Sequence, residues 1–206
     1  MSRGLLVTFE GPDGSGKTTQ VELLGRALEE RGIDPLVVRE PGGTEVGERI
    51  RSLLLDGPAM SPDAEMYLFM AARAELLATR ILPALLERRV VIADRYHDST
   101  LAYQGGGRGA TATWPPGFPK PDLTVLLAIP AGAGLDRLRA SGKRLDRLDS
   151  ESNDFHEAVA ATYEVLAAAE PDRWLRIDAT RSADAVNAEI AERVWRLLES
   201  REEARA

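Results

Sequence analysis

The chain has 206 residues, a length that favours one domain. It contains no cysteine, which excludes disulfides, cysteine-ligated zinc and a cysteine nucleophile. Its 33 acidic residues outnumber its 26 lysines and arginines and give a formal net charge of −7. Because nucleic acids and anionic membranes attract a basic face, this balance argues against general binding to either.

The amino-terminal residues 1–10 contain an apolar stretch that is too short for a signal peptide and ends in Glu10. Other apolar runs, such as residues 124–129, fall well below the roughly 20 residues that a membrane span needs. We therefore expect a cytoplasmic protein that does not enter a membrane.

Short apolar runs alternate with longer amphipathic segments. The short runs are apolar at both alternating positions, which is typical of parallel strands buried on both faces. The predicted strands are Leu5–Glu10, Pro35–Glu40, Val90–Asp94, Leu123–Ile129 and Trp174–Asp178. Helices are predicted near residues 17–31, 44–55, 61–87, 131–141, 151–169 and 182–199. This alternation predicts an α/β fold with right-handed crossovers.

Two stretches interrupt the alternation. Residues 105–109 are rich in glycine and residues 114–119 in proline, so both are predicted to be loop without regular structure. Residues 141–147 form a basic connection between two predicted helices. Each stretch is a candidate functional loop, although an ordinary surface loop is the simpler interpretation.

The sequence GPDGSGKT at residues 11–18 matches the phosphate-binding pattern G-x-x-x-x-G-K-[ST] in full. Glycines let backbone N–H groups turn toward phosphate oxygens, and the following helix presents its positive end to the same anion. Lys17 is expected to contact the β- and γ-phosphates of ATP, and the Thr18 hydroxyl is expected to coordinate Mg²⁺. The residues predicted to bind ATP are Gly11, Pro12, Asp13, Gly14, Ser15, Gly16, Lys17, Thr18 and Thr19.

The strand Val90–Asp94 ends in an acid, as a Walker B strand does. Ligands of such sheets bind beyond the carboxyl ends of the strands, so Asp94 is a candidate to hold Mg²⁺ or its waters, or to orient an attacking oxygen. An ordinary turn residue is the alternative. Arg95 suggests a second phosphate at the same crevice, because arginine binds phosphate bidentately, unless it is a plain surface charge.

A GTPase switch is disfavoured by the residues that follow Asp94. The pattern D-x-x-G would require glycine where His97 stands, and the guanine-reading pattern N-K-x-D is absent from the sequence. The phosphate loop therefore points to a class of enzyme other than the GTPases.

Several further blocks resemble the thymidylate kinase (dTMP kinase) family, and they cover most of the chain. The phosphate loop alone is common to a whole superfamily, whereas the order and spacing of the other blocks are specific. The blocks are FEGPDGSGKTTQ at 9–20, REPGGT at 39–44, RSLLL at 51–55, AARA at 71–74, DRY at 94–96, STLAYQG at 99–105 and PDLT at 121–124.

The resemblance implies a P-loop NTPase-type three-layer α/β/α fold with a five-stranded parallel sheet. It implies a single kinase domain over residues 1–206 with a short mobile lid at about 141–152. The implied reaction transfers the γ-phosphoryl group of ATP to dTMP and gives dTDP and ADP, with Mg²⁺ held by Thr18 and Asp94. Members of the family are usually homodimers, so a homodimer is expected.

The resemblance also assigns roles in binding dTMP. Asp13 would accept a hydrogen bond from the 3′-hydroxyl and orient Arg95, which would clamp the acceptor phosphate. Tyr103 would crowd the 2′ position and thereby prefer deoxyribose. The residues expected around the acceptor are Asp13, Arg39, Glu40, Pro41, Phe69, Arg73, Arg95, Ser99, Thr100, Tyr103 and Gln104.

The thymine ring is expected between three of these residues. Phe69 would stack on the ring, while Arg73 and Gln104 would read its polar edge. Phe69 and Arg73 are four residues apart and would share a helix face. Without the resemblance, Phe69 is more simply interpreted as a core aromatic.

No arginine stands at positions 12–15, so the phosphate loop itself supplies no catalytic guanidinium. The basic segment with Lys143, Arg144 and Arg147 resembles a lid that would bring one over ATP, with Arg147 as the first candidate and Arg144 as the second. Family members commonly carry arginines in the next helix, where this chain has Ala158 and Ala160. The predicted catalytic residues are Lys17, Asp94, Arg95, Arg144 and Arg147.

Two other functional classes remain as alternatives. One is a P-loop kinase for a nucleoside or for a different nucleoside monophosphate. The other is a non-catalytic ATP-binding module or an ATPase with a protein partner. Arg95 and Arg39 favour an acceptor that carries a phosphate, whereas an ATPase would hydrolyse ATP without responding to added dTMP.

Overall fold

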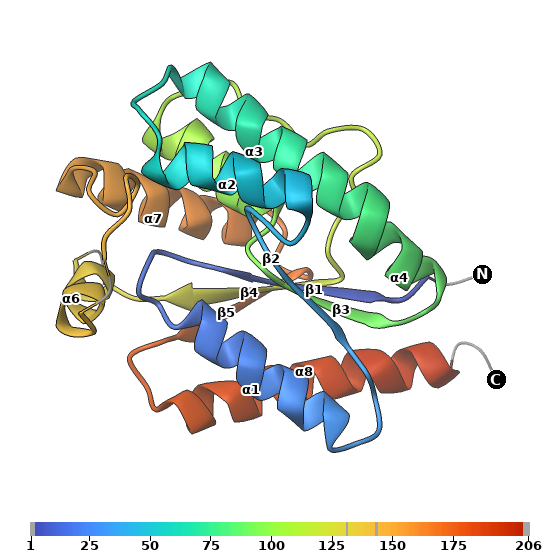
Figure 1. The fold of residues 1–206 in the computed structure, drawn as a ribbon. Coiled ribbons are helices and arrows are strands. Elements are labelled where there is room, and N and C mark those ends of the chain that lie inside the picture. Colours follow the sequence, from blue (N-terminus) through green and yellow to red (C-terminus); the bar gives the residue numbers. More distant parts are fainter. Residues whose placement is uncertain (1–2, 131, 143, 204–206) are drawn as a thin grey trace.

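The computed structural model describes residues 3–130, 132–142 and 144–203, which form a three-layer arrangement around one sheet (Figure 1). Five parallel strands lie in the order β2-β3-β1-β4-β5. Their bounds are β1 Leu5–Glu10, β2 Leu36–Arg39, β3 Val90–Asp94, β4 Leu123–Ala128 and β5 Trp174–Asp178. The five predicted strands are confirmed, although the second begins one residue later and ends one residue earlier than predicted, and the fourth ends one residue earlier.

Helices cover both faces of the sheet (Figure 1). α1 (Lys17–Glu29) and α8 (Ala183–Glu203) lie on one face. The other face carries α2 (Glu45–Asp56), α3 (Pro62–Leu76), α4 (Leu82–Leu86) and α7 (Asn153–Ala169). The shorter elements are α5 (His97–Thr100), α6 (Ala133–Ala140) and the π-helical turns η1 (Leu77–Ile81) and η2 (Leu101–Gly107). No helix within the described ranges is both long and apolar enough to span a bilayer.

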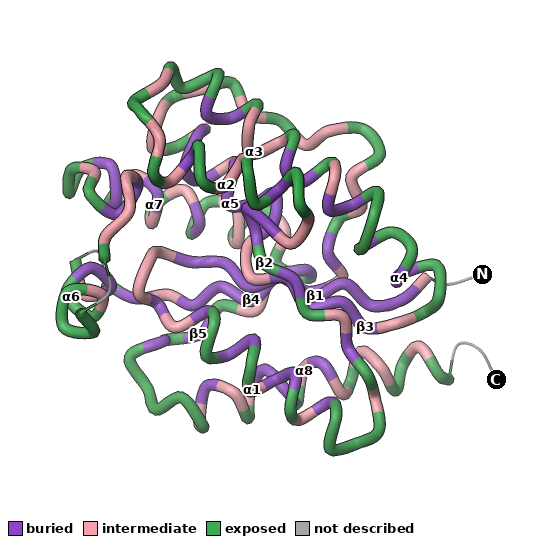
Figure 2. Tube along the Cα trace, in the orientation of Figure 1, coloured by how far each residue is buried: buried purple, intermediate pink, exposed green. Residues whose placement is uncertain are grey.

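β1 is the middle strand and is buried along its whole length (Figure 2). Leu5, Val7 and Phe9 join the core on the side of α1 and α8, and Leu6 joins the core beneath α3 and α4. Because consecutive side chains of a strand point to opposite faces, both faces must be apolar here. This packing explains the uninterrupted apolar character of the run.

The long helix predicted at residues 61–87 is divided by a π-helical turn. Its start is confirmed: the Ser61 side chain accepts a hydrogen bond from Ala64 N, and Pro62 occupies the first turn. Pro83 has no N–H to donate to the carbonyl of Thr79, so the regular α-helical ladder cannot continue through η1.

Residues 105–107 were predicted to be loop, and this prediction is wrong because they complete the helical turn η2. The glycines serve close packing here. A Cβ on Gly106 would lie 2.0 Å from Thr162 Oγ1 of α7, and one on Gly107 would lie 2.5 Å from the Phe155 ring. Residues 114–119 contain no helix or strand, as predicted.

The strand register places several polar residues at the same edge of the sheet. Asp94 pairs with Phe9 of β1 and with Arg39 of β2, so the three strands end at one level. The phosphate loop that follows β1 packs closely on α6. A Cβ on Gly14 would lie 2.0 Å from the carbonyl oxygen of Gly134, which requires glycine at this contact.

Candidate active site

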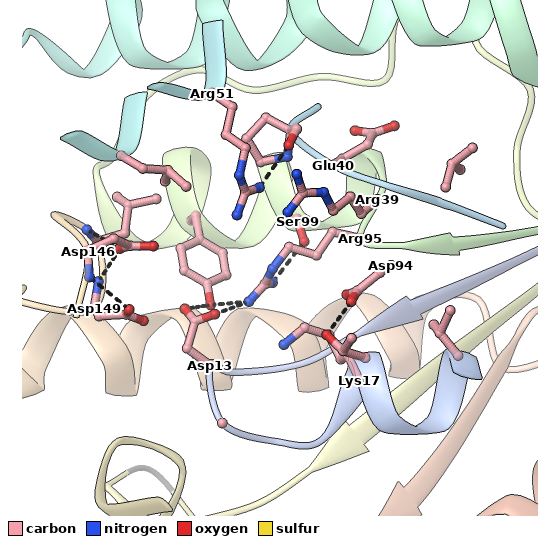
Figure 3. A pocket seen from close by; sticks show the side chains of 18 of the residues that line it. Asp13, Lys17, Arg39, Glu40, Arg51, Asp94, Arg95, Ser99, Asp146 and Asp149 are labelled. Carbon is pink, nitrogen blue, oxygen red and sulfur yellow. Dashed lines mark hydrogen bonds and ion pairs between the residues drawn. The ribbon is translucent and has the colours of Figure 1, made fainter. Parts of the chain in front are cut away.

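A cavity of about 770 Å³ opens at the carboxyl ends of β1, β2 and β3 (Figure 3). Its volume is in the range of sites that bind small molecules. Most of the residues predicted from the sequence to bind a ligand line it, and they come from segments far apart in the chain. They are Asp13, Gly14, Gly16, Lys17, Thr18, Thr19, Arg39, Glu40, Pro41, Phe69, Asp94, Arg95, Ser99, Thr100, Tyr103 and Gln104.

The phosphate loop ends where α1 begins, after Gly16 in the left-handed conformation with φ of 96°. Lys17 Nζ donates hydrogen bonds of 3.0 and 2.8 Å to the carbonyl oxygens of Gly11 and Pro12, at the back of the loop. Burial, together with the nearby Arg95, lowers the pKa of Lys17 to about 8 against the opposing charge of Asp13. An anion at the loop would stabilise the charged form of this amine.

Ser15 lies in the phosphate loop and faces the interior of the protein. Its side chain is buried, and its Oγ accepts a hydrogen bond of 3.4 Å from Lys17 Nζ. Gly11, Pro12 and Ser15 are outside the described lining of the cavity, so they shape the loop from behind.

Thr18 and Asp94 lie side by side, since Thr18 Oγ1 donates a 2.6 Å hydrogen bond to Asp94 Oδ2. One hydroxyl and one carboxylate are hard oxygen donors of the kind that Mg²⁺ accepts together with phosphate oxygens and water. Within the ranges that the structure describes, no three His, Asp or Glu side chains are grouped to hold a metal ion. The pair therefore fits a magnesium ion that the nucleotide helps to hold.

Arg95 has the left-handed backbone conformation, with φ of 72°, which is uncommon for a residue with a side chain. Its guanidinium forms an ion pair with Asp13 of the phosphate loop (Figure 3). It also donates hydrogen bonds of 3.1 Å to Ser99 Oγ and to Tyr103 Oη. These contacts fix a cation at the cavity beside the phosphate loop.

Asp13 is the partner that holds Arg95 in place. The Tyr103 hydroxyl donates a 2.6 Å hydrogen bond to Asp13 Oδ2. Burial raises the pKa of Asp13, but Arg95 and Lys17 outweigh this effect and keep it well below its ordinary value. Asp13 is therefore an anion between two cations.

Glu10 and Tyr163 lie beneath Arg95 and were not assigned roles from the sequence. Glu10 is fully buried, and its Oε2 accepts hydrogen bonds of 2.5 Å from Ser99 Oγ and 2.9 Å from Tyr163 Oη. Burial raises the pKa of Glu10 to about 7. A carboxyl group at the end of a buried strand is a signal that could have identified Glu10, whereas nothing in the sequence singles out Tyr163.

Arg73 is buried behind the cavity and is outside its described lining. It forms a 2.5 Å ion pair with Glu40 and donates a 2.9 Å hydrogen bond to Thr100 Oγ1. Burial raises the pKa of Glu40 to about 7 against the opposing charge of Arg73. Glu40 Oε1 is buried and has no hydrogen-bond partner among the described residues.

Phe69 of α3 lines the cavity, and so does Gln104 of η2. Gln104 Nε2 donates a 2.9 Å hydrogen bond to Glu65 Oε1, again from α3. The structure thus brings together the predicted stacking residue and one of the two predicted base-reading residues.

Arg51 also lines the cavity and was missed as a site residue, although it belongs to the block at 51–55. It donates a 2.8 Å hydrogen bond to the carbonyl of Pro41. Arg39 lies nearby and pairs with Glu48 at 3.1 Å. Two arginines from β2 and α2 therefore add positive charge to the side of the cavity that faces Arg95 (Figure 3).

The predicted lid arginines lie outside the described lining of the cavity in this conformation. Arg147 forms a 2.7 Å ion pair with Glu65 and donates a 2.9 Å hydrogen bond to the carbonyl of Leu54. Arg144 is exposed and lies 3.8 Å from Asp56. Lys143 lies outside the described residues. The catalytic roles of Arg144 and Arg147 stay predictions.

Comparison with known proteins agrees with this geometry. A family model described as thymidylate kinase matches residues 9–190. A thymidylate kinase of Thermomicrobium roseum is 48% identical over 196 residues, covering 92% of this chain and 91% of that protein. One from Pseudomonas syringae pv. tomato is 44% identical over 205 residues, covering 95% of this chain and 97% of that protein. The crystal structure of thymidylate kinase from Ehrlichia chaffeensis superposes with a TM-score of 0.76 at 28% identity, covering 94% and 99% of the two chains. The chain belongs to the thymidylate kinase family.

Proposed function

We propose that this protein transfers the γ-phosphoryl group of ATP to dTMP and produces dTDP and ADP. The observation that carries the proposal is that Arg95 is fixed by Asp13 of the phosphate loop at the same cavity as Lys17. Two cations at one cavity suit a reaction that brings two phosphates together.

The donor side is the phosphate loop. The loop and the start of α1 direct backbone N–H groups and the positive end of the helix toward the β- and γ-phosphates. Lys17 adds a mobile positive charge, because the hydrogen bonds that it now makes to two backbone carbonyls can be exchanged for phosphate oxygens.

Thr18 and Asp94 are the proposed holders of Mg²⁺. When bound, the ion would neutralise charge on the phosphate oxygens of the donor. Asp94 is also proposed to orient the acceptor, a role supported by its place in the lining of the same cavity as Arg95.

The acceptor side lies between β2, α3 and η2. Arg95 is proposed to bind the phosphate of dTMP, and Phe69 to stack on the thymine ring. An oxygen of this phosphate attacks the γ-phosphorus of ATP, while the bond from that phosphorus to the oxygen of ADP breaks. Catalysis then consists of alignment and of positive charge around the transferred group.

The segment at residues 141–152 is the proposed lid of a single kinase domain. Asp146, Leu148 and Asp149 line the cavity, which supports a role of this segment at the site. Arg147, or otherwise Arg144, would reach the transferred phosphoryl group when the lid closes over ATP.

A homodimer in the cytoplasm is the proposed state of the protein. Val46 and Leu53 of α2 and Tyr67 of α3 are exposed apolar side chains on neighbouring helices, which supports self-association there. Sedimentation of the wild type and of a Tyr67→Arg variant tests this, with a shift to monomer expected in the variant. The cytoplasm supplies the ATP that the reaction needs.

The activity is tested with a panel of acceptors and Mg·ATP. We expect dTMP to be phosphorylated in preference to dUMP, dCMP, UMP and CMP, and thymidine not to be phosphorylated. If thymidine were the acceptor and dTMP were inert, the proposal would fail. Hydrolysis of ATP that does not respond to any acceptor would instead identify an ATPase.

A further inference from the structure

Glu65 of α3 is a buried carboxylate on which three segments meet. Its side chain is 1% exposed. Gln104 Nε2 of η2 lies 2.9 Å from Oε1, and Arg147 of the proposed lid lies 2.7 Å from Oε2. Arg108 donates 3.3 Å hydrogen bonds to both oxygens. One side chain therefore contacts the acceptor pocket and the lid at once.

The charge state of Glu65 fixes what its neighbours can do. Burial raises its pKa, but hydrogen bonds from Gln104, Arg108 and Arg147 outweigh burial, so the pKa lies below its ordinary value. Glu65 is then ionised at neutral pH and can only accept hydrogen bonds.

An acceptor-only partner determines the orientation of the Gln104 amide. The NH₂ group must face Glu65, so the carbonyl oxygen Oε1 points away from Glu65 within the plane of the amide. Gln104 lines the cavity, and no hydrogen bond to its Oε1 occurs among the described residues. At this position the Gln104 side chain can therefore offer the pocket the acceptor Oε1, whereas its donor Nε2 is used by Glu65.

We propose that Glu65 is a positioning residue for base specificity: it holds the Gln104 amide so that the pocket accepts pyrimidines with a ring N–H donor. Thymine and uracil carry a hydrogen at ring nitrogen 3, whereas neutral cytosine has a lone pair there. A cytosine would place two acceptors against each other and leave both buried without a partner. The inference rests on the proposed function, because it takes Gln104 as a residue that contacts the base.

The test compares dTMP with 5-methyl-dCMP, which differs from dTMP only at ring positions 3 and 4. The measured quantity is the ratio of kcat/KM for the two substrates. Glu65→Gln retains the size of the side chain but can donate a hydrogen bond, which frees the Gln104 amide to turn over. We expect this variant to lower the ratio at least about tenfold relative to the wild type.

Two matched controls separate orientation from charge and packing. Glu65→Asp stays acceptor-only, and we expect its ratio to remain within about threefold of the wild type even where its rate falls. Arg108→Gln removes the ion pairs with Glu65 and Glu151 but leaves the hydrogen bond between Glu65 and Gln104, and its ratio should be retained in the same way. Effects on lid closure alter both substrates equally and cancel in the ratio.

A second variant decides the question if Glu65→Gln does not fold. The exchange Glu65→Gln with Gln104→Glu preserves one donor and one acceptor at the contact and still places a carboxylate oxygen toward the base. We expect it to prefer dTMP over 5-methyl-dCMP. Equal use of the two substrates by this double variant, or an unchanged ratio in a folded Glu65→Gln, overturns the inference. Failure of the proposed function would be seen separately, as wild-type protein that does not phosphorylate dTMP.

Discussion

The hydroxyl of Tyr103 donates a 2.6 Å hydrogen bond to Asp13 Oδ2 and accepts one of 3.1 Å from Arg95. The side chain that is expected to exclude a 2′-hydroxyl therefore also supports the cation proposed to bind the acceptor phosphate. The Arg95 guanidinium lies over the Tyr103 ring as well, 4.9 Å from its centroid. We therefore expect selection of the sugar and positioning of the phosphate to depend on the same residue.

These two functions can be separated by substitution. Tyr103→Phe keeps the ring but removes both hydrogen bonds, so we expect kcat to fall about tenfold while the preference for dUMP over UMP is kept. Tyr103→Ala also removes the ring, and the preference should then decline. Steady-state rates with the two nucleotides, which differ only at the 2′ position, provide the measurement. An alanine variant that still rejects UMP would remove Tyr103 from the specificity argument.

Arg95 is expected to be essential for turnover. Arg95→Ala removes a fixed positive charge next to the transferred group and should reduce kcat about a thousandfold. Arg95→Lys should recover little, because an ammonium group cannot reproduce the planar contacts to Asp13, Ser99 and Tyr103. Arg176→Ala, which breaks an exposed pair with Glu164, is the matched control. A near-normal rate in Arg95→Ala would contradict the assigned role.

The sequence predicted the parts of the site that local patterns encode. The spacing of the glycines before Lys17 determines the backbone conformation of the phosphate loop. The acid at the end of β3 must lie at the carboxyl edge of the sheet. Lys17 and Asp94 both line the cavity. The contact between Arg147 and Glu65 joins residues 82 positions apart, and it depends on which face of α3 is buried and where the segment after α6 lies. No periodicity encodes such a contact. The loop prediction for the glycines of η2 failed for a related reason. A residue without a Cβ suits a flexible loop, but it also suits a helical turn that packs closely on α7, and the sequence does not distinguish the two.

The ion pair between Arg147 and Glu65 must break before Arg147 can reach a phosphate of ATP. Arg147→Ala should therefore lower kcat about a hundredfold and leave the dissociation constant of dTMP nearly unchanged. Arg144→Ala should have a smaller effect, because Arg144 is exposed and, within the described part of the chain, its ion pair is a long contact of 3.8 Å with Asp56. Single-turnover rates and equilibrium binding of dTMP separate the two effects. Loss of dTMP affinity in step with kcat would place Arg147 in the acceptor site instead.

Proton uptake should accompany nucleotide binding because of Lys17. Its pKa is lowered to about 8 chiefly by burial, so near pH 8 about half of the free protein carries a neutral amine. The phosphates of ADP favour the charged form, and binding should take up about half a proton at this pH. Calorimetric titration with ADP in buffers of different ionisation enthalpy measures the number of protons taken up on binding. Lys17→Arg, which stays charged, should show no uptake, and equal uptake in both proteins would assign the proton to another group.

Glu10 should make the stability of the protein depend on pH in a defined direction. Burial raises its pKa from 4.5 to about 7 in the folded state, so the folded protein binds the proton more tightly than the unfolded chain. The contribution of Glu10 to the free energy of unfolding therefore falls as the pH rises from about 4.5 to about 7, by up to about 3 kcal/mol, and changes little above that range. Glu10→Gln cannot ionise and should lack this decline.

Urea denaturation of the wild type and of Glu10→Gln between about pH 5 and pH 8 measures the difference between their free energies of unfolding. The wild type should lose stability relative to the variant across this interval. Glu164→Gln, at an exposed position of α7, is the control and should show a nearly constant difference. A wild type that gains stability relative to Glu10→Gln as the pH rises would show that Arg95 and the two hydroxyl groups keep Glu10 ionised. The buried carboxylate would then serve as a permanent countercharge to Arg95.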